Sequence, residues 1–356
     1  MALGCCKSLK SISSERNAKM NRKSYIALFG VSLVGLGIGI FVYKKRASTK
    51  AKGIKFSVGT PALNTLKSIK EPALLKLVMD KYDFDAKTKT RYFWNSEEVD
   101  DSIDDWYPAS TVKYLAAAGA LERLSKLGFN SEDTTVTFHY KNGKNPTVVP
   151  FTDILNKAIV NSDNTKYNQL VQVAGHQRLH DTILADYDLH LSRPYVKDAW
   201  QKLTGSREFD SPQITLQDTS GKSVILEADS HQAPRACPSR SSCARLSSFT
   251  DSIYDLVLGG RFDISDSNRS ELLRVLSAKK PRGDTFLDAI LSQISNEAFD
   301  VYHKAGFAIN YYSDSILLVS PSGKKAYAIS AVGFKGRDSL TDLGKAIGQL
   351  INDGVV

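Results

Sequence analysis

The pattern of hydrophobic and polar residues divides the chain into a helical middle and ends that contain strands. In the middle, apolar residues recur at steps of three or four, which is typical of helices with one buried face. Shorter apolar runs bounded by turn residues lie near residue 90 and after residue 300, and these predict strands. The predicted helices cover residues 61–76, 110–127, 151–160, 164–174, 176–186, 243–259, 268–277, 284–296 and 340–351, and the predicted late strands cover residues 302–309, 315–320 and 326–332.

The order of these elements indicates the fold class. Strands near both chain ends, with helices between them, predict an α/β (α+β) sandwich. Its antiparallel sheet is built from both ends of the chain, is flanked by helices and carries an inserted all-helical subdomain. Within the polar segment 203–236, the apolar runs 214–216 and 223–226 flank Asp-Thr-Ser-Gly-Lys, which predicts an added hairpin.

Residues 25–43 form an apolar run of 19 residues without a charge. A helix of this length, at about 1.5 Å per residue, just crosses a hydrocarbon core of about 30 Å. A cleaved signal peptide has a shorter apolar core followed by small residues, whereas Lys-Lys-Arg follows this run. The sequence therefore favours a single uncleaved transmembrane anchor, and basic residues on both sides leave its orientation open. The expected organisation is a basic tail (1–24), the anchor (25–43), a linker (44–58) and one domain (59–356).

The positive charge of the chain is concentrated at its N-terminus. The whole chain has a formal net charge of +9, but residues 1–55 carry twelve Lys and Arg against one acid, Glu15. The remainder has 35 basic and 37 acidic residues. A nucleic-acid partner therefore loses its main support, because the folded part lacks the basic excess that attracts phosphate.

The cysteines fall in two groups, Cys5 with Cys6 and Cys237 with Cys243. If the domain lies outside the cytoplasm, the second pair has the spacing for a small-loop disulfide. Two free thiols in a loop explain the same spacing equally well.

The residues with a pattern for covalent chemistry begin at Ser110. A serine hydroxyl is a weak nucleophile without a neighbouring base. Residues three apart share a helix face, so Ser110 and Lys113 place a hydroxyl beside an amine in the first turn of a strong predicted helix. There the helix dipole favours a developing negative charge and a neutral amine. The same spacing at Ser277–Lys280 and Ser322–Lys325 shows that this motif alone is weak.

Two further motifs strengthen the assignment of Ser110. Ser162-Asp163-Asn164 lies between two predicted helices, and Lys304-Ala305-Gly306 lies in the first predicted late strand. Together with Ser110-Thr-Val-Lys113, in this order, they resemble the motifs of class A serine β-lactamases and penicillin-binding proteins. The surrounding segments YPASTVKYLAAAGALERL, FTDILNKAIVNSDNTKYNQLVQVAG and VYHKAGFAINYYSDSILLVSPSGKKAYAISAVGF resemble the same family, and the likeness covers roughly residues 60–356.

The resemblance implies a role in acyl transfer for each matched residue. Ser110 would attack an amide carbonyl and Lys113 would accept its proton, while Ser162 would pass a proton to the leaving nitrogen. The backbone N–H groups of Ser110 and Phe307 would form the oxyanion hole.

The resemblance also implies how a substrate would be held. Asn164 would bind the substrate's side-chain amide, and Lys304 would supply positive potential toward its carboxylate, with Ala305, Gly306 and Phe307 lining the substrate. Asp163 would orient its loop, although Ser-Asp-Asn taken alone is also a typical helix N-cap.

Two positions depart from the family pattern. In class A enzymes, a Glu two residues after the Arg of Leu-x-Arg activates the deacylating water. Here Leu191-Ser192-Arg193 places Tyr195 at that position, and Tyr is a poor base because its pKa is about 10. Ala305 replaces the usual Thr or Ser and removes a hydroxyl that would bind a substrate carboxylate. Rapid class A deacylation is therefore in doubt.

The resulting hypothesis is a membrane-anchored serine hydrolase that forms an acyl-enzyme on Ser110 with β-lactam or D-Ala-D-Ala amides. Its domain would lie on the periplasmic or extracellular side, and its partner would be a small-molecule or peptide substrate. No cofactor is expected, and the oligomeric state stays open. The alternative is a catalytically idle relative that uses the cleft to bind a ligand. A metal site at His176 and His180 is disfavoured because Gln replaces the catalytic Glu and no third ligand is evident, so both histidines are expected on the surface.

Overall fold

The computed structural model describes residues 55–59, 66, 69, 75–94, 108–140, 145–187, 190–191, 210–230, 242–243, 245–280, 285–308, 311–334 and 337–356. All of them belong to one compact unit, Val42–Val356. The predicted anchor at 25–43 lies outside the described residues. No helix among the residues that are described is both long enough and apolar enough to cross a membrane.

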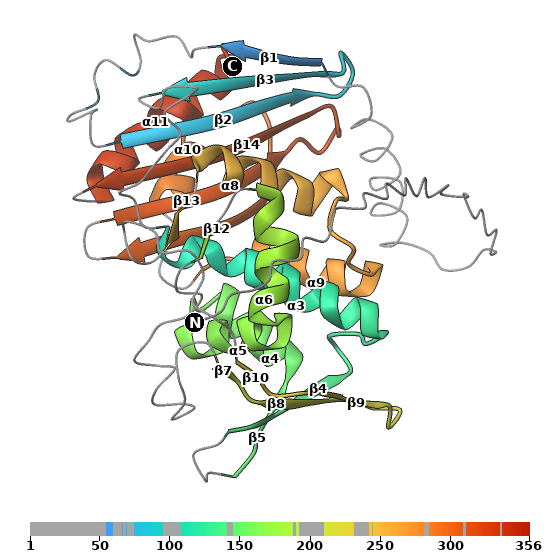
Figure 1. Ribbon diagram of the computed structural model, residues 1–356. Helices are drawn as coiled ribbons and strands as arrows, with labels where there is room; N and C mark the ends of the chain where they lie inside the picture. Colours follow the sequence, from blue (N-terminus) through green and yellow to red (C-terminus); the bar gives the residue numbers. More distant parts are fainter. Residues whose placement is uncertain are drawn as a thin grey trace, which may run out of the picture. The chain divides into compact units, whose positions relative to one another are not determined.

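A six-stranded sheet forms the upper half of this unit (Figure 1). Its strands come from both ends of the described chain, as predicted, and all but one of the pairings are antiparallel. The exception is β1, which pairs in parallel with β3. In spatial order the strands are β1 (Lys55–Gly59), β3 (Thr88–Trp94), β2 (Leu75–Asp83), β14 (Lys325–Phe334), β13 (Tyr311–Val319) and β12 (Asp300–Ala308).

The beginning of the sheet corrects two expectations. Strand β1 starts at Lys55, inside the segment 44–58 that was expected to be a linker, so the domain begins before residue 59. Strand β2 starts at Leu75, where a helix over 61–76 was predicted. The burial pattern explains the second difference: both Leu75 and Leu77 are fully buried, as alternate residues on one face of a strand can be.

Helices cover both faces of the sheet, and each face has its own hydrophobic cluster. On the face toward the viewer in Figure 1, α3 (Lys113–Leu127) and α8 (Leu246–Tyr254) pack with residues such as Val78 and Leu317. On the opposite face, α10 (Thr285–Leu291) and α11 (Arg337–Asn352) pack with residues such as Met79 and Ile329. The alternation of buried residues on the strands therefore serves two layers of helices, which is the predicted sandwich.

The inserted subdomain is not all-helical, which corrects the prediction. Its helices are α4 (Phe151–Ile159), α5 (Asn164–Ala174), α6 (His176–Leu179), η3 (His180–Leu184), η4 (Ala185–Tyr187) and α9 (Asp266–Ser277), and η5 (Asp255–Gly259) extends α8. Beside them lies a four-stranded antiparallel sheet in the order β5 (Thr147–Pro150), β4 (Thr134–His139), β8 (Gln213–Asp218) and β9 (Ser223–Leu226). The predicted hairpin is thus present as β8 and β9, but β4 recruits it into a larger sheet because Val136 and Phe138 on one face of β4 pack in the core.

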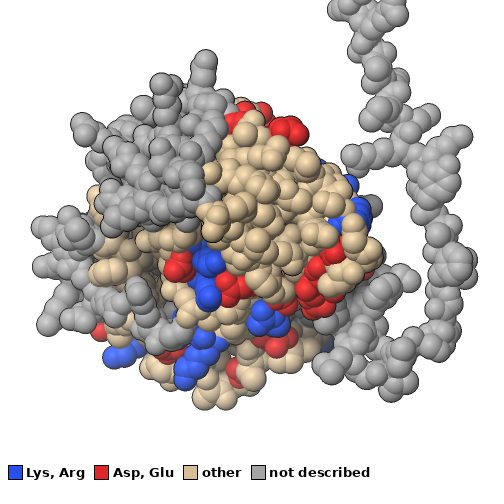
Figure 2. Space-filling model, turned by 90° about the horizontal axis from the view of Figure 1, so that it is seen from below, with Lys and Arg blue, Asp and Glu red and all other residues tan. Residues whose placement is uncertain are grey.

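Two pairs of very short strands close the remaining loops. β6 (His190–Leu191) pairs with β11 (Ser242–Cys243), and β7 (Asp210–Ser211) pairs with β10 (Asp229–Ser230). Cys237 lies outside the described residues, so the predicted disulfide with Cys243 stays a prediction. Figure 2 shows the lower face of the domain, where Lys and Arg side chains are intermingled with Asp and Glu side chains.

Candidate active site

Ser110 lies in a short 3₁₀ turn, η2 (Ala109–Val112), that leads directly into helix α3. Its neighbour Ala109 has a φ of 49°, a left-handed conformation that costs free energy for a residue with a Cβ. Neither η2 nor α3 has a side-chain cap at its N-terminus. The partial positive charge of the first turn is therefore directed at the position of Ser110.

Lys113 is the first residue of α3, and its amine is directed toward the loop before α5. The side chain is buried, and its Nζ donates hydrogen bonds to the Ser162 carbonyl oxygen at 2.5 Å and to Asn164 Oδ1 at 2.8 Å. Ser162 Oγ lies 3.4 Å from the same amine, and the amine also lies 5.5 Å from the centre of the Tyr167 ring. The predicted amine is thus held between two of the predicted motifs.

The Ser162-Asp163-Asn164 segment owes its shape to a helix start. Asp163 is the N-cap of α5, and its Oδ1 accepts a hydrogen bond from the Lys166 amide at 2.8 Å. Ser162 has a φ of 57°, again left-handed. Among the described residues, only three other than glycine have positive φ, and two of them, Ala109 and Ser162, adjoin or belong to the motifs. Such strain is typical of functional sites, where surrounding contacts hold the backbone.

Strand β12 brings the third motif to the same place. Lys304 is buried, and its Nζ donates to Ser162 Oγ at 3.2 Å and to the Ala305 carbonyl oxygen at 2.6 Å. The Ser162 hydroxyl therefore lies between the amines of Lys113 and Lys304. β12 forms one edge of the six-stranded sheet, which leaves backbone groups of its outer edge for a ligand.

Gly306 allows β12 to approach the turn that carries Ser110. A Cβ atom at residue 306 would lie 2.3 Å from the Pro108 carbonyl oxygen and 2.8 Å from the Thr111 amide nitrogen. Residues with side chains cannot make this contact without a backbone shift, so glycine is required here for packing.

A small hydroxyl network fixes the same contact from the neighbouring strand. Ser313 on β13 has its Oγ 2.9 Å from Thr111 Oγ1, and it donates to the Pro108 carbonyl oxygen at 3.0 Å. Thr111 and Ser313 are both buried. This network and the ring of Tyr167 were not found from the sequence, because neither belongs to one of the three motifs.

The side chains of Ala305 and Phe307 lie outside this polar group. Ala305 packs against the hydrophobic cluster on the α10 and α11 face of the sheet. The Phe307 side chain is 59% exposed, and its ring contacts Tyr312 with centroids 6.4 Å apart. Only the backbone of Phe307 therefore retains the predicted role in an oxyanion hole.

The structure thus brings together Lys113, Ser162, Asn164 and Lys304 beside the turn of Ser110, with Asp163 as the cap that shapes their loop. Tyr195 lies outside the described residues. His303 is buried on β12, with its Nδ1 3.5 Å from Asp314 Oδ1.

The two histidines of α6 and η3 differ in part from the expectation. His176 is only 4% exposed and so is not a surface residue, because α6 packs its side chain into the subdomain. Its ring lies 4.7 Å from that of His180. In the described part of the chain, no cluster of three or more His, Cys, Asp or Glu residues is placed to hold a metal ion.

Comparisons with known proteins agree with this geometry. The sequence profile of the Beta-lactamase enzyme family matches residues 75–355. A search of curated proteins by sequence gives no match. Solved structures with the same fold include the TLA-3 extended-spectrum β-lactamase, at a TM-score of 0.54 and 13% identity over 82% of this chain and 97% of that one.

Two further structures show the range of the fold. A β-lactamase from Burkholderia vietnamiensis has a TM-score of 0.53 and 15% identity over 82% of this chain and 96% of its own. PBP-A, solved as an acyl-enzyme complex with penicillin G, has a TM-score of 0.52 and 11% identity over 81% and 95%. At such identities these structures show the fold alone, whereas the profile covers most of the chain. The chain belongs to the Beta-lactamase enzyme family.

Proposed function

We propose that this protein is a membrane-anchored serine hydrolase whose Ser110 forms an acyl-enzyme with amide substrates of the β-lactam or D-Ala-D-Ala type. The observation that carries the proposal is the convergence of the Lys113 and Lys304 amines on the Ser162 hydroxyl beside the start of the Ser110 helix. Three segments distant in sequence supply these groups, and their order along the chain matches the family pattern.

In acylation, Ser110 Oγ bonds to the carbonyl carbon of the substrate while its proton passes to the Lys113 amine. That amine must be neutral to accept a proton, and the positive charge of nearby Lys304 favours the neutral form. The first-turn amide of Ser110 and the amide of Phe307 stabilise the oxyanion. As the carbon–nitrogen bond breaks, the proton moves from Lys113 through Ser162 Oγ to the leaving nitrogen, a path that the 3.4 Å contact supports.

Substrate recognition rests on two of the same residues. The positive charge of Lys304 attracts a substrate carboxylate, although the alanine at residue 305 supplies no hydroxyl to share that load. A lost neutral hydrogen bond is worth about 0.5–1.5 kcal/mol, which weakens binding without abolishing it. The Asn164 amide, already bound to Lys113 through Oδ1, can donate from its nitrogen to a substrate amide.

Deacylation is the step we expect to be slow. A water molecule must attack the ester carbon of the acyl-enzyme, and class A enzymes use a glutamate for this. Tyr195 occupies that sequence position, and a phenol with a pKa near 10 is mostly protonated at neutral pH. The acyl-enzyme should therefore accumulate, as in penicillin-binding proteins.

The location of the domain is part of the proposal. Residues 25–43 would form a single membrane span, with the catalytic domain on the periplasmic or extracellular side, where such amides occur. The competing function is a binding protein without turnover, which the alanine at 305 and the tyrosine at 195 favour.

One experiment separates these functions. The full-length chain, purified in detergent, is incubated with a fluorescent penicillin, and labelling and release are followed by gel and intact mass, with Ser110→Ala as the control variant. A stable adduct on Ser110, absent from the variant, supports slow acyl transfer. Rapid hydrolysis without an adduct indicates another deacylating base. No labelling and no hydrolysis would refute β-lactam chemistry and favour the binding function.

A further inference from the structure

A cavity of about 660 Å³ lies between the sheet and helix α8, and it shares no lining residue with the Ser110 site. It is bounded by β2 and β3 on one side, by α8 and η5 on another, and by η4 on a third. Its volume falls within the range of about 300–1,000 Å³ that is typical of small-molecule sites. The residues that line it are Tyr82, Lys89, Arg91, Ala185, Asp186, Tyr187, Arg245, Ser247, Ser248, Asp251, Tyr254, Asp255, Gly259 and Arg261.

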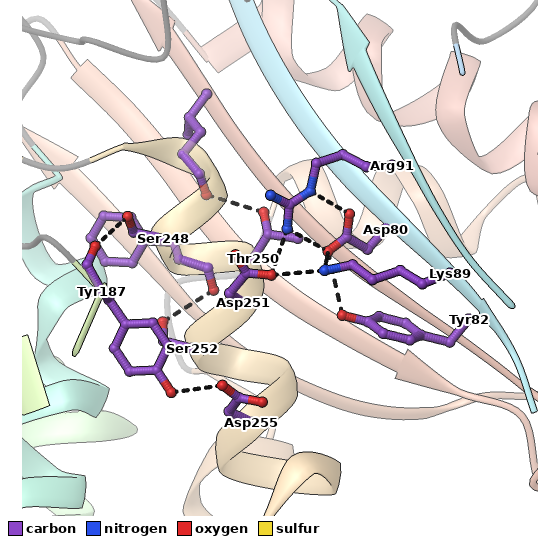
Figure 3. A network of polar contacts seen from close by, with 12 residues as sticks. Asp80, Tyr82, Lys89, Arg91, Tyr187, Ser248, Thr250, Asp251, Ser252 and Asp255 are labelled. Atoms are coloured by element: carbon purple, nitrogen blue, oxygen red, sulfur yellow. Dashed lines mark hydrogen bonds and ion pairs between the residues drawn. The ribbon is translucent and has the colours of Figure 1, made fainter. Parts of the chain in front are cut away.

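One wall carries cations that project from the sheet toward α8 (Figure 3). Arg91 makes a two-point contact with Asp80, with Nε 2.7 Å from Oδ1 and Nη2 2.7 Å from Oδ2, and the Asp80 side chain is fully buried. Lys89 lies 2.8 Å from Asp80 as well. Both cations also contact Oδ1 of Asp251 on α8, a side chain that is 37% exposed.

The opposite wall combines acids with a cation and a tyrosine. The Tyr187 hydroxyl donates to Asp255 Oδ2 at 2.9 Å. Arg261 lies 3.2 Å from Asp186 and 3.8 Å from Asp255, and its guanidinium stacks 5.1 Å from the centre of the Tyr187 ring. The side chains of Arg261 and Asp186 are 48% and 52% exposed, so this pair can open without unfolding the wall.

Stacked aromatic rings form the floor of the cavity. The rings of Tyr82 and Tyr254 are parallel, with centroids 3.8 Å apart. The Tyr254 side chain is deeply buried, and among the described residues its hydroxyl has no hydrogen-bond partner. Burial raises the pKa of Tyr254, so the phenol stays neutral.

The balance of charges determines what such a cavity can bind. Each exposed cation here is already paired with a carboxylate, as Arg261 is with Asp186 and Lys89 with Asp251. A purely anionic ligand would displace a carboxylate and leave it uncompensated, and a purely cationic ligand would do the same to a guanidinium or ammonium group. A ligand that carries both charges exchanges one ion pair for two and leaves neither protein group unpaired.

We propose that this cavity is a second ligand site, which binds a short peptide with free ends. The peptide's carboxylate faces the cations of β3 and Arg261, and its ammonium group faces Asp251, Asp255 and Asp186. The tyrosine rings contact the peptide's side chains. This site does not depend on the chemistry proposed for Ser110, so the two proposals can fail separately.

The test measures binding of dialanine to the full-length chain in detergent by isothermal titration calorimetry and ligand-detected NMR. Two matched probes remove one charge each: N-acetyl-dialanine lacks the ammonium group, and dialanine amide lacks the carboxylate. The proposal expects dialanine to bind at least about tenfold more tightly than either probe, because each loses one charge-assisted hydrogen bond. Equal binding of the acetylated probe would show a simple anion site and overturn the proposal.

Three variants place the binding on this cavity. Asp251→Asn and Arg261→Gln remove one charge from each wall and should each weaken dialanine binding about tenfold. Asp85→Asn is the control, because it breaks an ion pair with Lys324 on the exposed surface elsewhere, where the side chains are 57% and 64% exposed. Thermal unfolding checks that the variants are folded.

A last measurement distinguishes this cavity from the catalytic cleft. Dialanine binding is repeated after the cleft has been acylated with penicillin and also in Ser110→Ala. Binding that persists in both, and that Asp251→Asn and Arg261→Gln weaken, supports the second site. No binding, binding unchanged in both cavity variants, or binding blocked by acylation would overturn it.

Discussion

Replacing Gly306 with alanine tests whether the contact between β12 and the Ser110 turn sets the reactivity of the nucleophile. The added Cβ would lie 2.3 Å from the Pro108 carbonyl oxygen and 2.8 Å from the Thr111 amide nitrogen. Both are backbone atoms, so neither can rotate away. The strand must withdraw until these distances reach at least 3.0 Å, and the hydroxyl contact between Thr111 and Ser313 resists that movement.

The expected consequence is a loss of acylation rate rather than a loss of fold. The withdrawal moves the Phe307 amide and Lys304 away from Ser110, and a misplacement of about 1 Å can cost about 10²-fold in rate. We therefore expect the second-order rate constant for labelling by a fluorescent penicillin to fall by about 10²-fold in Gly306→Ala. Stopped-flow fluorescence or timed gel samples of the full-length chain measure that constant.

A matched control comes from the far side of the sheet. At Gly348 on α11, an added Cβ would lie 2.3 Å from the Ile290 carbonyl oxygen, which is the same backbone clash away from the site. Gly348→Ala should lower the unfolding temperature and leave the labelling rate of the folded protein nearly unchanged. Labelling of Gly306→Ala at the unsubstituted rate, or an equal loss in both variants, would refute the reasoning.

Three further predictions concern single residues. Lys113→Met should slow labelling of Ser110 by about 10²–10⁴-fold, the usual contribution of a general base, and an unchanged rate would exclude Lys113 from that role. Arg91→Ala leaves the fully buried Asp80 carboxylate without its two-point partner and should lower the free energy of unfolding by about 3–5 kcal/mol in denaturant titrations, a loss that Arg91→Met with Asp80→Leu should largely restore. Burial is the main cause that raises the pKa of Asp255, so its ionised form destabilises the fold; Asp255→Asn should be more stable than the unsubstituted chain at neutral pH, and the difference should vanish below about pH 4, where the carboxyl is protonated both folded and unfolded.

The helices of the domain were largely predictable, because a buried helical face leaves a regular signal in the sequence. The run from Ser110 to Leu127 became η2 and α3, and the helix over 340–351 lies within α11. The three motifs could be placed because each follows a recognisable local structure: a helix start, a capped loop and an edge strand. Their meeting point followed from the family resemblance rather than from any local pattern.

The rest depended on contacts between residues far apart in the chain. Strand β4 alternates threonine with Val136 and Phe138, but it became visible as a strand only through its pairing with β5 and β8. The two-point contact of Arg91 with Asp80 joins two strands of one hairpin, and Asp251 joins them from 160 positions further along the chain. A charged residue such as Asp80 in an otherwise apolar strand was the only signal in the sequence that could have pointed to this cluster.

The pairing of β7 with β10 has a consequence for the architecture of the chain. Because Ser211 lies opposite Asp229, the segment between them leaves the domain and returns to the same place. Its ends are neighbours, as they are in a domain insertion, so a short linker could bridge the gap without altering the path of any other element. The excursion is nevertheless bound into the protein, because Ile214, Leu216 and Leu226 are each no more than 7% exposed. Each such side chain contributes about 1.5–3 kcal/mol by its burial. The hairpin is therefore separable in topology and inseparable in energy, as expected for an insertion that has become part of the core.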